Sequence, residues 1–166
     1  MSLVDKYPQE VKKILAKYPP ERRQSAVMPL LHLAQLEKGF VDRHMVVEIA
    51  RICGVTETDV AEIIGFYTLY HDKPEGKLRI QVCNDISCAL RGADEFLVQL
   101  CERLGIQPGG TTPDGLITVE AVMCLAACDK APMFQVQGPE GISYHENMTV
   151  DKTMAFIESA RKEVKA

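Results

Sequence analysis

Residues 77–92 read KLRIQVCNDISCALRG, and this stretch decides how the second half of the chain folds. Its beginning, KLRIQVC, alternates apolar and polar residues, which is the pattern of a β-strand. The strand ends at Cys83, a second cysteine follows at Cys88, and Gly92 opens a helix that we predict to run to residue 104. The stretch therefore predicts a strand and a helix joined by a loop that carries two thiols.

The segments after this helix complete the order of elements. A loop dense in turn formers, GIQPGGTTPDG, leads to LITVEAV (116–122), which predicts a second strand. Strand, helix and strand at this spacing predict a parallel pair with a right-handed crossover. MFQVQ and ISYHE then predict an antiparallel hairpin around GPEG, and residues 150–164 predict a last helix. The order βαβ followed by ββα is the thioredoxin-like arrangement.

Residues 8–70 have a helical rhythm throughout. Their apolar spacing predicts four helices, the second of which covers residues 21–36 and contains Pro29, so we expect a kink or a break at the proline. Asp42 is placed to cap the third helix, and Thr56 with the aspartate three positions later resembles a capping box for the fourth. This part of the chain predicts a small helical bundle.

The polar Pro/Gly segment HDKPEGK (71–77) predicts a linker between the two parts. We therefore expect two domains: a helical bundle over residues 1–72, suited to partner docking, and a thioredoxin-like ferredoxin domain over residues 73–166. The fold class combines α/β and α+β features, because a βαβ unit is followed by an antiparallel hairpin and a helix.

Composition narrows the classes of function. The 166 residues carry a net charge of −4 and a pI near 5.6, which argues against a nucleic-acid partner. No apolar run approaches the roughly 18 residues that span a bilayer, and the polar start resembles neither a signal peptide nor a transit peptide. We therefore expect a cytoplasmic chain without direct membrane insertion, whose cysteines bind metal or react rather than form structural disulfides.

Six cysteines divide into two groups. Cys53 and Cys101 lie inside predicted helices, where a cysteine acts as a small apolar core residue. The other four lie in loops that follow the two parallel strands, and the ends of parallel strands meet at one edge of a sheet. We therefore expect these four thiols to converge: Cys83, Cys88, Cys124 and Cys128.

Three kinds of chemistry are open to four converging thiols. A thioredoxin-type dithiol commonly has the spacing C-x-x-C, which is absent from this sequence. Structural zinc accepts four thiolates, and the spacing of the pairs is compatible with it. A 2Fe-2S cluster takes two thiolates on each iron, and small residues such as Ala126 and Ala127 would let backbone N–H groups approach its sulfurs.

The paired motif C-x4-C-x3-G (CNDISCALRG) and C-x3-C-x2-A-P (CLAACDKAPMF) resembles the thioredoxin-like 2Fe-2S subunit of the NADH-oxidising module of complex I, the NADH:quinone oxidoreductase. YPPERRQSAVMPLLHLAQLEKGFV, GFYTLY and TPDGLITVEAVMCL resemble further parts of the same family, so the resemblance covers about residues 8–160. It implies one 2Fe-2S cluster as cofactor and no catalytic residue. By position, the implied cluster ligands are Cys83, Cys88, Cys124 and Cys128. Many members have glycine where this chain has Ala126, and alanine disfavours positive φ.

The resemblance also implies partners and a location. The family member docks, partly through its helical domain, on a flavoprotein that binds FMN and NADH, among other subunits of the peripheral arm at the inner face of the membrane. Electrons pass singly between the cluster and the FMN, and the isolated chain is not expected to oxidise NADH. Related subunits serve soluble NAD-dependent formate dehydrogenases and NAD-reducing hydrogenases. A zinc-stapled interaction module is the alternative from a different class of function.

Two further expectations concern the surroundings of the cysteines. Asp85 and Asp129 lie close to them in the sequence, so their negative charge should favour a low reduction potential, partly offset by Lys130. By analogy with thioredoxin-like folds, the Ala131-Pro132 bond is a candidate for the cis isomer.

Overall fold

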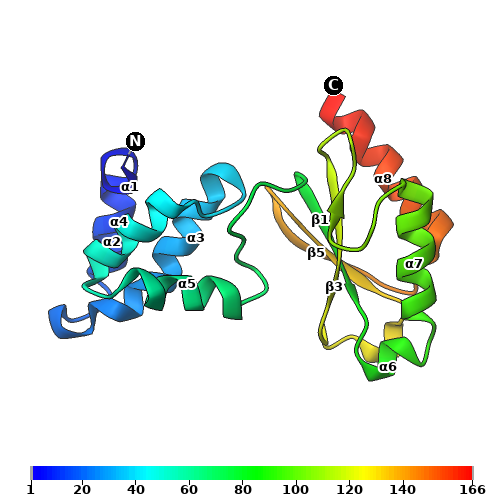
Figure 1. Ribbon diagram of the computed structural model, residues 1–166, viewed down its shortest axis with the longest axis horizontal. Coiled ribbons are helices and arrows are strands. Elements are labelled where there is room, and N and C mark those ends of the chain that lie inside the picture. The colour runs from blue at the N-terminus through cyan, green and yellow to red at the C-terminus, as the bar shows by residue number, and fades with distance from the viewer. Residues whose placement is uncertain (1, 166) are drawn as a thin grey trace. The chain divides into compact units, whose positions relative to one another are not determined.

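The computed structural model describes residues 2–165, and the side chains of residues 2–163. The chain forms two compact units, one extending to Pro74 and the other beginning at Glu75 (Figure 1). This division falls inside the segment 71–77, which the sequence predicted as the linker. Among the described residues, no helix has the length and apolar character that crossing a bilayer requires.

The first unit is built only of helices. One apolar core joins them, in which Leu30, Leu31 and Ile49 are fully buried. The short first helix is held by Glu48, whose carboxylate accepts hydrogen bonds from the Ser2 hydroxyl and from backbone N–H groups of that helix. The helices are α1 (Leu3–Lys6), α2 (Pro8–Leu15), η1 (Pro20–Ala26), α3 (Val27–Lys38), α4 (Arg43–Cys53) and α5 (Glu57–Phe66).

The predicted second helix is broken, but not at the proline. A 3₁₀ helix, η1, ends at Ala26, and α3 begins at Val27 with Pro29 in its first turn. A proline is tolerated there because the first N–H groups of a helix have no partner inside the helix. The break between η1 and α3 therefore lies upstream of the residue that predicted it.

The predicted helix ends are confirmed. The Asp42 carboxylate accepts from the Met45 N–H at 3.0 Å at the start of α4, and Thr56 and Asp59 form the reciprocal capping box of α5. Gly54 ends α4 in the left-handed conformation that glycine adopts without penalty.

The second unit is a five-stranded sheet in the order β2-β3-β1-β4-β5. β1 runs parallel to β3 and antiparallel to β4, and β4 and β5 form the hairpin, so the predicted βαβ-ββα order is confirmed. The sequence missed the two-residue β2 and the single turn α6. The elements are β1 (Leu78–Cys83), α6 (Ile86–Ala89), α7 (Ala93–Leu104), β2 (Gly110–Thr111), β3 (Ile117–Val122), η2 (Cys128–Lys130), β4 (Phe134–Gly138), β5 (Gly141–His145) and α8 (Val150–Lys165).

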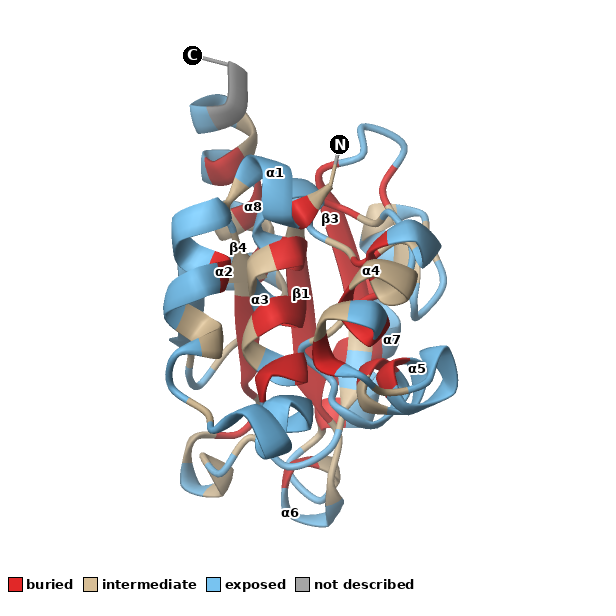
Figure 2. Ribbon diagram, turned by 90° about the vertical axis from the view of Figure 1, so that its left-hand side faces the viewer, coloured by how far each residue is buried: buried red, intermediate tan, exposed pale blue. Residues whose placement is uncertain are grey.

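Helices α7 and α8 cover one face of the sheet (Figure 1). Ile80 and Val82 of β1 pack there against Leu100 of α7 and Ile157 of α8, and all four are fully buried. The strands stand out as buried in Figure 2, where β1 and β3 are coloured red along much of their length. The central strand is thus fixed by apolar packing as well as by its hydrogen bonds on both sides.

The residues of β1 that alternate with this apolar set carry a polar ladder. Gln81 donates to the Glu120 carboxylate on β3 at 2.8 Å and accepts from the Gln135 amide on β4. The register places these three side chains directly opposite one another. A one-residue slip would break the ladder and also turn the apolar set of β1 away from the helices, so the ladder helps to fix the register.

Gly76 lies two residues before β1, where the backbone approaches β3 very closely. Its N–H donates to the Thr118 hydroxyl at 2.7 Å. A Cβ at this position would lie 2.6–2.8 Å from backbone atoms of Leu116, Ile117 and Thr118, which is closer than real Cβ atoms come. Only glycine fits here without moving one of the central strands.

We predict that Gly76→Ala destabilises the protein by about 3 kcal/mol, because the new methyl group meets backbone that cannot rotate away. Urea unfolding followed by circular dichroism measures the change. Gly138→Ala in the same sheet is the control, since the atom closest to its Cβ is a terminal methyl group of Leu78. Equal losses for the two variants would contradict the argument from backbone proximity.

Candidate metal centre

The four loop cysteines come from two connections at one edge of the sheet. Cys83 is the last residue of β1 and Cys88 lies in α6, while Cys124 follows β3 and Cys128 begins η2. Cys83 pairs in register with Val122, the last residue of β3, so both loops leave from the same edge. In Figure 1 this is the end of the unit where α6 lies. The predicted convergence of the two loops is confirmed.

The thiols are arranged as two pairs that interact with each other. The sulfurs of Cys124 and Cys128 are 3.8 Å apart. The pKa of Cys88 is raised by Cys83, and also by the charges of Cys124 and Cys128. All four side chains therefore form one electrostatically coupled group, although they come from positions up to 45 residues apart in the sequence (128 − 83).

The interaction between the thiols raises the pKa of two of them. Burial, followed by the hydrogen bond and charge of Cys83, raises the pKa of Cys88 to about 12. The hydrogen bond and charge of Cys124 raise the pKa of Cys128, and a hydrogen bond with Ser87 opposes this shift. Without a cation, therefore, these two cysteines hold their protons more tightly than a free thiol does.

Burial separates the two pairs. Cys83 and Cys88 are each 1% exposed and pack with Ala93, Ala131 and Met133 in a small apolar cluster of their own. Cys124 is exposed and Cys128 is half-buried. The site thus has a closed side formed by the first loop and an open side formed by the second.

The second loop takes an unusual backbone conformation. Ala126 has φ of +60°, a left-handed value that glycine adopts more readily than alanine, and its N–H points to the sulfur of Cys124 at 3.4 Å. The sequence marked this residue as the departure from the related pattern, and the loop keeps its turn in spite of the alanine. The Ala131-Pro132 peptide bond, a candidate for the cis isomer, is cis.

Sequence reasoning missed the role of Ser87. Ser87 belongs to the first loop, yet its side chain lowers the pKa of Cys128 in the second loop. The sequence offered one indication, the position of Ser87 directly before Cys88. The effect of Ser87 on Cys128 depends on the turn α6, which the apolar spacing did not predict.

The remaining cysteines are core residues, as predicted. Cys53 and Cys101 are buried in separate apolar cores, at 5% and 2% exposure. Burial raises the pKa of Cys53 to about 11 and also raises that of Cys101. Both thiols are therefore held neutral and away from the loop cysteines.

The donor set fits a thiolate-bound metal centre. Two thiolates on one tetrahedral ion, each about 2.3 Å from the metal, lie about 3.8 Å apart, which matches the separation of Cys124 and Cys128. A cation would also offset the repulsion between neighbouring thiolates and lower the pKa values of the thiols, because its positive charge favours deprotonated ligands. Within residues 2–165, no three His, Cys, Asp or Glu side chains already surround a single ion site. The structure shows two thiol pairs.

Comparison with known proteins assigns the family. The thioredoxin-like 2Fe-2S ferredoxin family matches residues 11–161, so the chain belongs to this family. It is 45% identical to NADH-quinone oxidoreductase subunit 2 of Thermus thermophilus, over 92% of this chain and 84% of the relative. It is 41% identical to an NADH-quinone oxidoreductase subunit of Rhizobium meliloti, over 92% of this chain and 88% of the relative.

A solved structure shares the fold at lower sequence identity. The crystal structure of an NAD+-reducing NiFe hydrogenase in the air-oxidised state matches with a TM-score of 0.68 and 20% identity. The match covers 83% of this chain but only 23% of the hydrogenase chain. This likeness concerns the fold alone, and it includes most of both compact units.

We predict an order of alkylation in the reduced, metal-free protein. Iodoacetamide should modify Cys124 first, because it is exposed, and Cys128 more slowly, because its pKa is raised. Cys83 and Cys88 should react last, after the fold opens. Timed quenching and peptide mass spectrometry give the four rates, and a sample in guanidinium chloride gives the unprotected reference. Equal rates for Cys124 and Cys88 in the folded protein would contradict the burial of the first pair.

Proposed function

We propose that this chain is an electron-transfer subunit of an NADH:quinone oxidoreductase and that it holds one 2Fe-2S cluster. The proposed ligands are Cys83, Cys88, Cys124 and Cys128. The observation that carries the proposal is the meeting of two thiol pairs, one from each loop, at the edge where the parallel strands β1 and β3 end. A 2Fe-2S cluster takes two thiolates on each iron, so the division into pairs supports this cofactor.

When bound, the cluster supplies a centre that gains or loses one electron at a time. The protein's own part is to hold the sulfurs and to control their surroundings. The closed side, with Cys83 and Cys88 at 1% exposure, keeps water from two of the ligands, while the open side at Cys124 leaves a short path to a partner. The Ala126 N–H, directed at the Cys124 sulfur, offers a hydrogen bond that stabilises negative charge on the thiolate.

The partner we propose is a flavoprotein that carries FMN and oxidises NADH. This chain has no G-x-G-x-x-G motif after a strand and no P-loop, so the nucleotide chemistry is assigned to another subunit. The names of the two relatives, both NADH-quinone oxidoreductase subunits, support this assembly. We place the chain in the cytoplasm, peripheral to the inner face of the membrane through its complex.

A second candidate keeps the cofactor and changes the assembly. The resemblance of the cysteine motifs extends to subunits of soluble NAD-linked complexes, so a hydrogenase or a formate dehydrogenase is the alternative parent that we propose for this subunit. In both assemblies the chain exchanges single electrons with a flavin. The identity of the subunits that copurify with the native chain distinguishes the two.

We predict that the anaerobically purified protein is red-brown and contains about two irons and two sulfides per chain. Dithionite should bleach the visible bands and produce an EPR signal from one unpaired electron. Iron, sulfide and zinc are assayed on the same sample. Iodoacetamide should leave the four proposed ligand cysteines unmodified in the cluster-loaded protein and should modify them in a denatured control. The flavin-free protein should show no NADH oxidation. A colourless protein with one tightly bound zinc, even after reconstitution, would leave only the zinc-stapled module.

We predict that Asp129→Asn raises the midpoint potential by less than about 59 mV, the tenfold step for one electron. The direction follows from removal of a negative charge near Cys128. The shift stays small because the Asp129 side chain is 76% exposed and lies 3.2 Å from the Lys130 ammonium. Redox titration at two ionic strengths measures it, with the larger shift at low salt.

The control for this measurement is Glu140→Gln. Glu140 is an exposed acid in the turn between β4 and β5, at the other end of the β4 strand from Phe134, which pairs with Val82 beside the cysteines. No shift for Asp129→Asn, or the same shift for both variants, would show that local charge at Asp129 does not set the potential.

A further inference from the structure

Gly65 lies inside helix α5 without a structural need for glycine. Its φ is not in the left-handed region, and a Cβ built on it meets no atom within 4 Å. The helix is ended by Tyr67, whose backbone is extended with φ of −94°, so the cap does not require glycine at position 65. Glycine in a helix is less favourable than alanine, because it loses more conformational freedom when the chain folds. The chain thus keeps an open space on its surface at a cost in stability.

Gly65 is one of the residues that line a shallow surface groove of about 570 Å³. We call it the α5 groove, and its lining residues are Asp59, Glu62, Ile63, Gly65, Phe66 and Tyr67. The Phe66 side chain is 78% exposed, Tyr67 is 42% exposed, and their rings meet edge to face at 5.1 Å. Tyr67 in turn contacts Tyr70, whose hydroxyl donates to the Met28 carbonyl on α3. The exposed aromatic pair is therefore anchored to the bundle.

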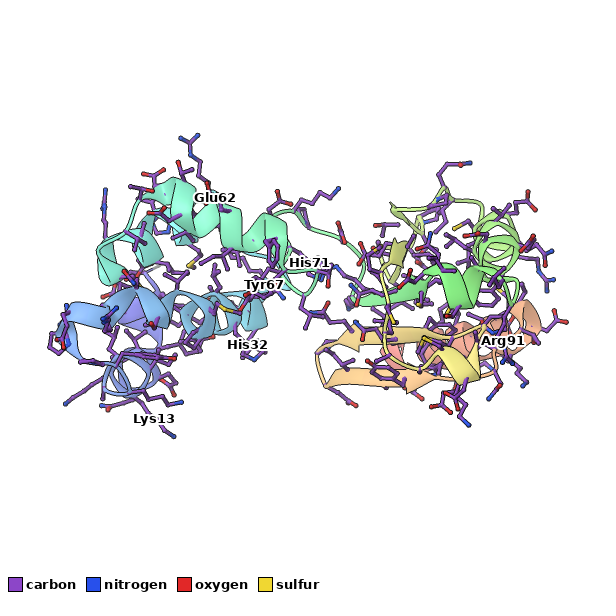
Figure 3. All side chains as sticks on the ribbon, turned by 90° about the horizontal axis from the view of Figure 1, so that it is seen from below. Lys13, His32, Glu62, Tyr67, His71 and Arg91 are labelled. Carbon is purple, nitrogen blue, oxygen red and sulfur yellow. The ribbon has the colours of Figure 1, made fainter. Side chains whose placement is uncertain are left out.

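The charge of the α5 groove is negative. Helix α5 carries three acidic residues and no basic one, and two of the acids, Asp59 and Glu62, line the groove. Asp59 is engaged with Thr56 in the capping box, whereas the Glu62 carboxylate has no ion pair or hydrogen bond among the described residues. The C-terminal turn of α5, which ends at Phe66, adds the negative end of the helix dipole. Figure 3 marks Glu62 on α5 and Tyr67 just beyond the end of the helix.

We propose that the α5 groove is a docking site for a segment of the partner flavoprotein that presents a lysine or arginine beside an apolar side chain. The cation would lie against the aromatic faces of Phe66 and Tyr67 and pair with Glu62, while the apolar neighbour would fill the space above Gly65. This inference rests on the proposed function, because that function supplies the partner. It adds the surface and the chemistry of contact.

The test measures the affinity of the cluster-loaded chain for the FMN-loaded, NADH-oxidising flavoprotein of the same organism by biolayer interferometry. Gly65→Leu fills the groove, and Glu62→Lys reverses its free charge. Each should weaken binding about tenfold or more, and the loss for Glu62→Lys should be larger at low salt. The matched controls on the exposed face of α2, Lys12→Leu and Glu10→Lys, should bind as the wild type does.

Folding and cluster content are checked for every variant. Gly65→Leu should melt no lower than the wild type, because leucine favours the helix and the space for its Cβ is open. The EPR signal of the reduced cluster should be unchanged. Weaker binding by a variant with intact melting and EPR signal would therefore locate the effect at the groove.

The other outcomes overturn the inference in distinguishable ways. Wild-type affinity in both groove variants would reject the docking site and leave the electron-transfer function standing. A change in the oligomeric state of the free chain, seen by light scattering, would make a second copy of this chain the occupant and reject the flavoprotein segment. A wild-type chain with an intact cluster and no affinity for the flavoprotein would reject both the docking site and the proposed partner.

Discussion

The parallel pairing of β1 with β3 is the constraint on which the rest of the structure depends. Parallel strands end on the same side of a sheet, so the pairing of Cys83 with Val122 brings together two loops that are distant in sequence. The apolar face beneath α7 and α8 and the polar ladder through Gln81 both fix the same register. A slip of one residue would damage all of these at once, and the thiols would no longer converge.

The pairing of β1 with β3 explains where the four thiols lie. The unequal burial of the two loops explains the chemistry that is open to them. Four thiolates in one place repel each other, and the raised pKa of Cys88 records that repulsion together with burial. The closed side is buried because Cys88 of α6 and Ala93 at the start of α7 pack on it, and the open side is a loop that holds Ala126 in a left-handed conformation. The fold thus brings two thiol pairs to one edge of the sheet, and the metal centre that we propose there would balance the negative charge of the thiolates.

Much of this could be predicted from the sequence, because the relevant signals are periodic or local. Alternation in KLRIQVC, the cap at Asp42 and the capping box at Thr56 depend on residues within a few positions of one another, and the structure has each element. The break before Val27, the turn α6 and the role of Ser87 could not be predicted. Each of these depends on contacts between segments that no local spacing records.

Two glycines also show that the sequence alone does not reveal why a residue occupies its position. Gly76 and Gly65 look alike in the sequence, yet a Cβ added at Gly76 would lie 2.6 Å from the backbone of Thr118, whereas a Cβ added at Gly65 would meet open space. For Gly76 the fold itself supplies the reason for glycine, because any side chain would push the strands apart. For Gly65 the described chain supplies none, while exposed aromatic rings and a carboxylate unpaired among the described residues surround the same space. Exposed apolar rings beside an unpaired carboxylate and an open helix position are typical of a surface that binds another molecule, which is why we propose a partner segment as the occupant of the α5 groove.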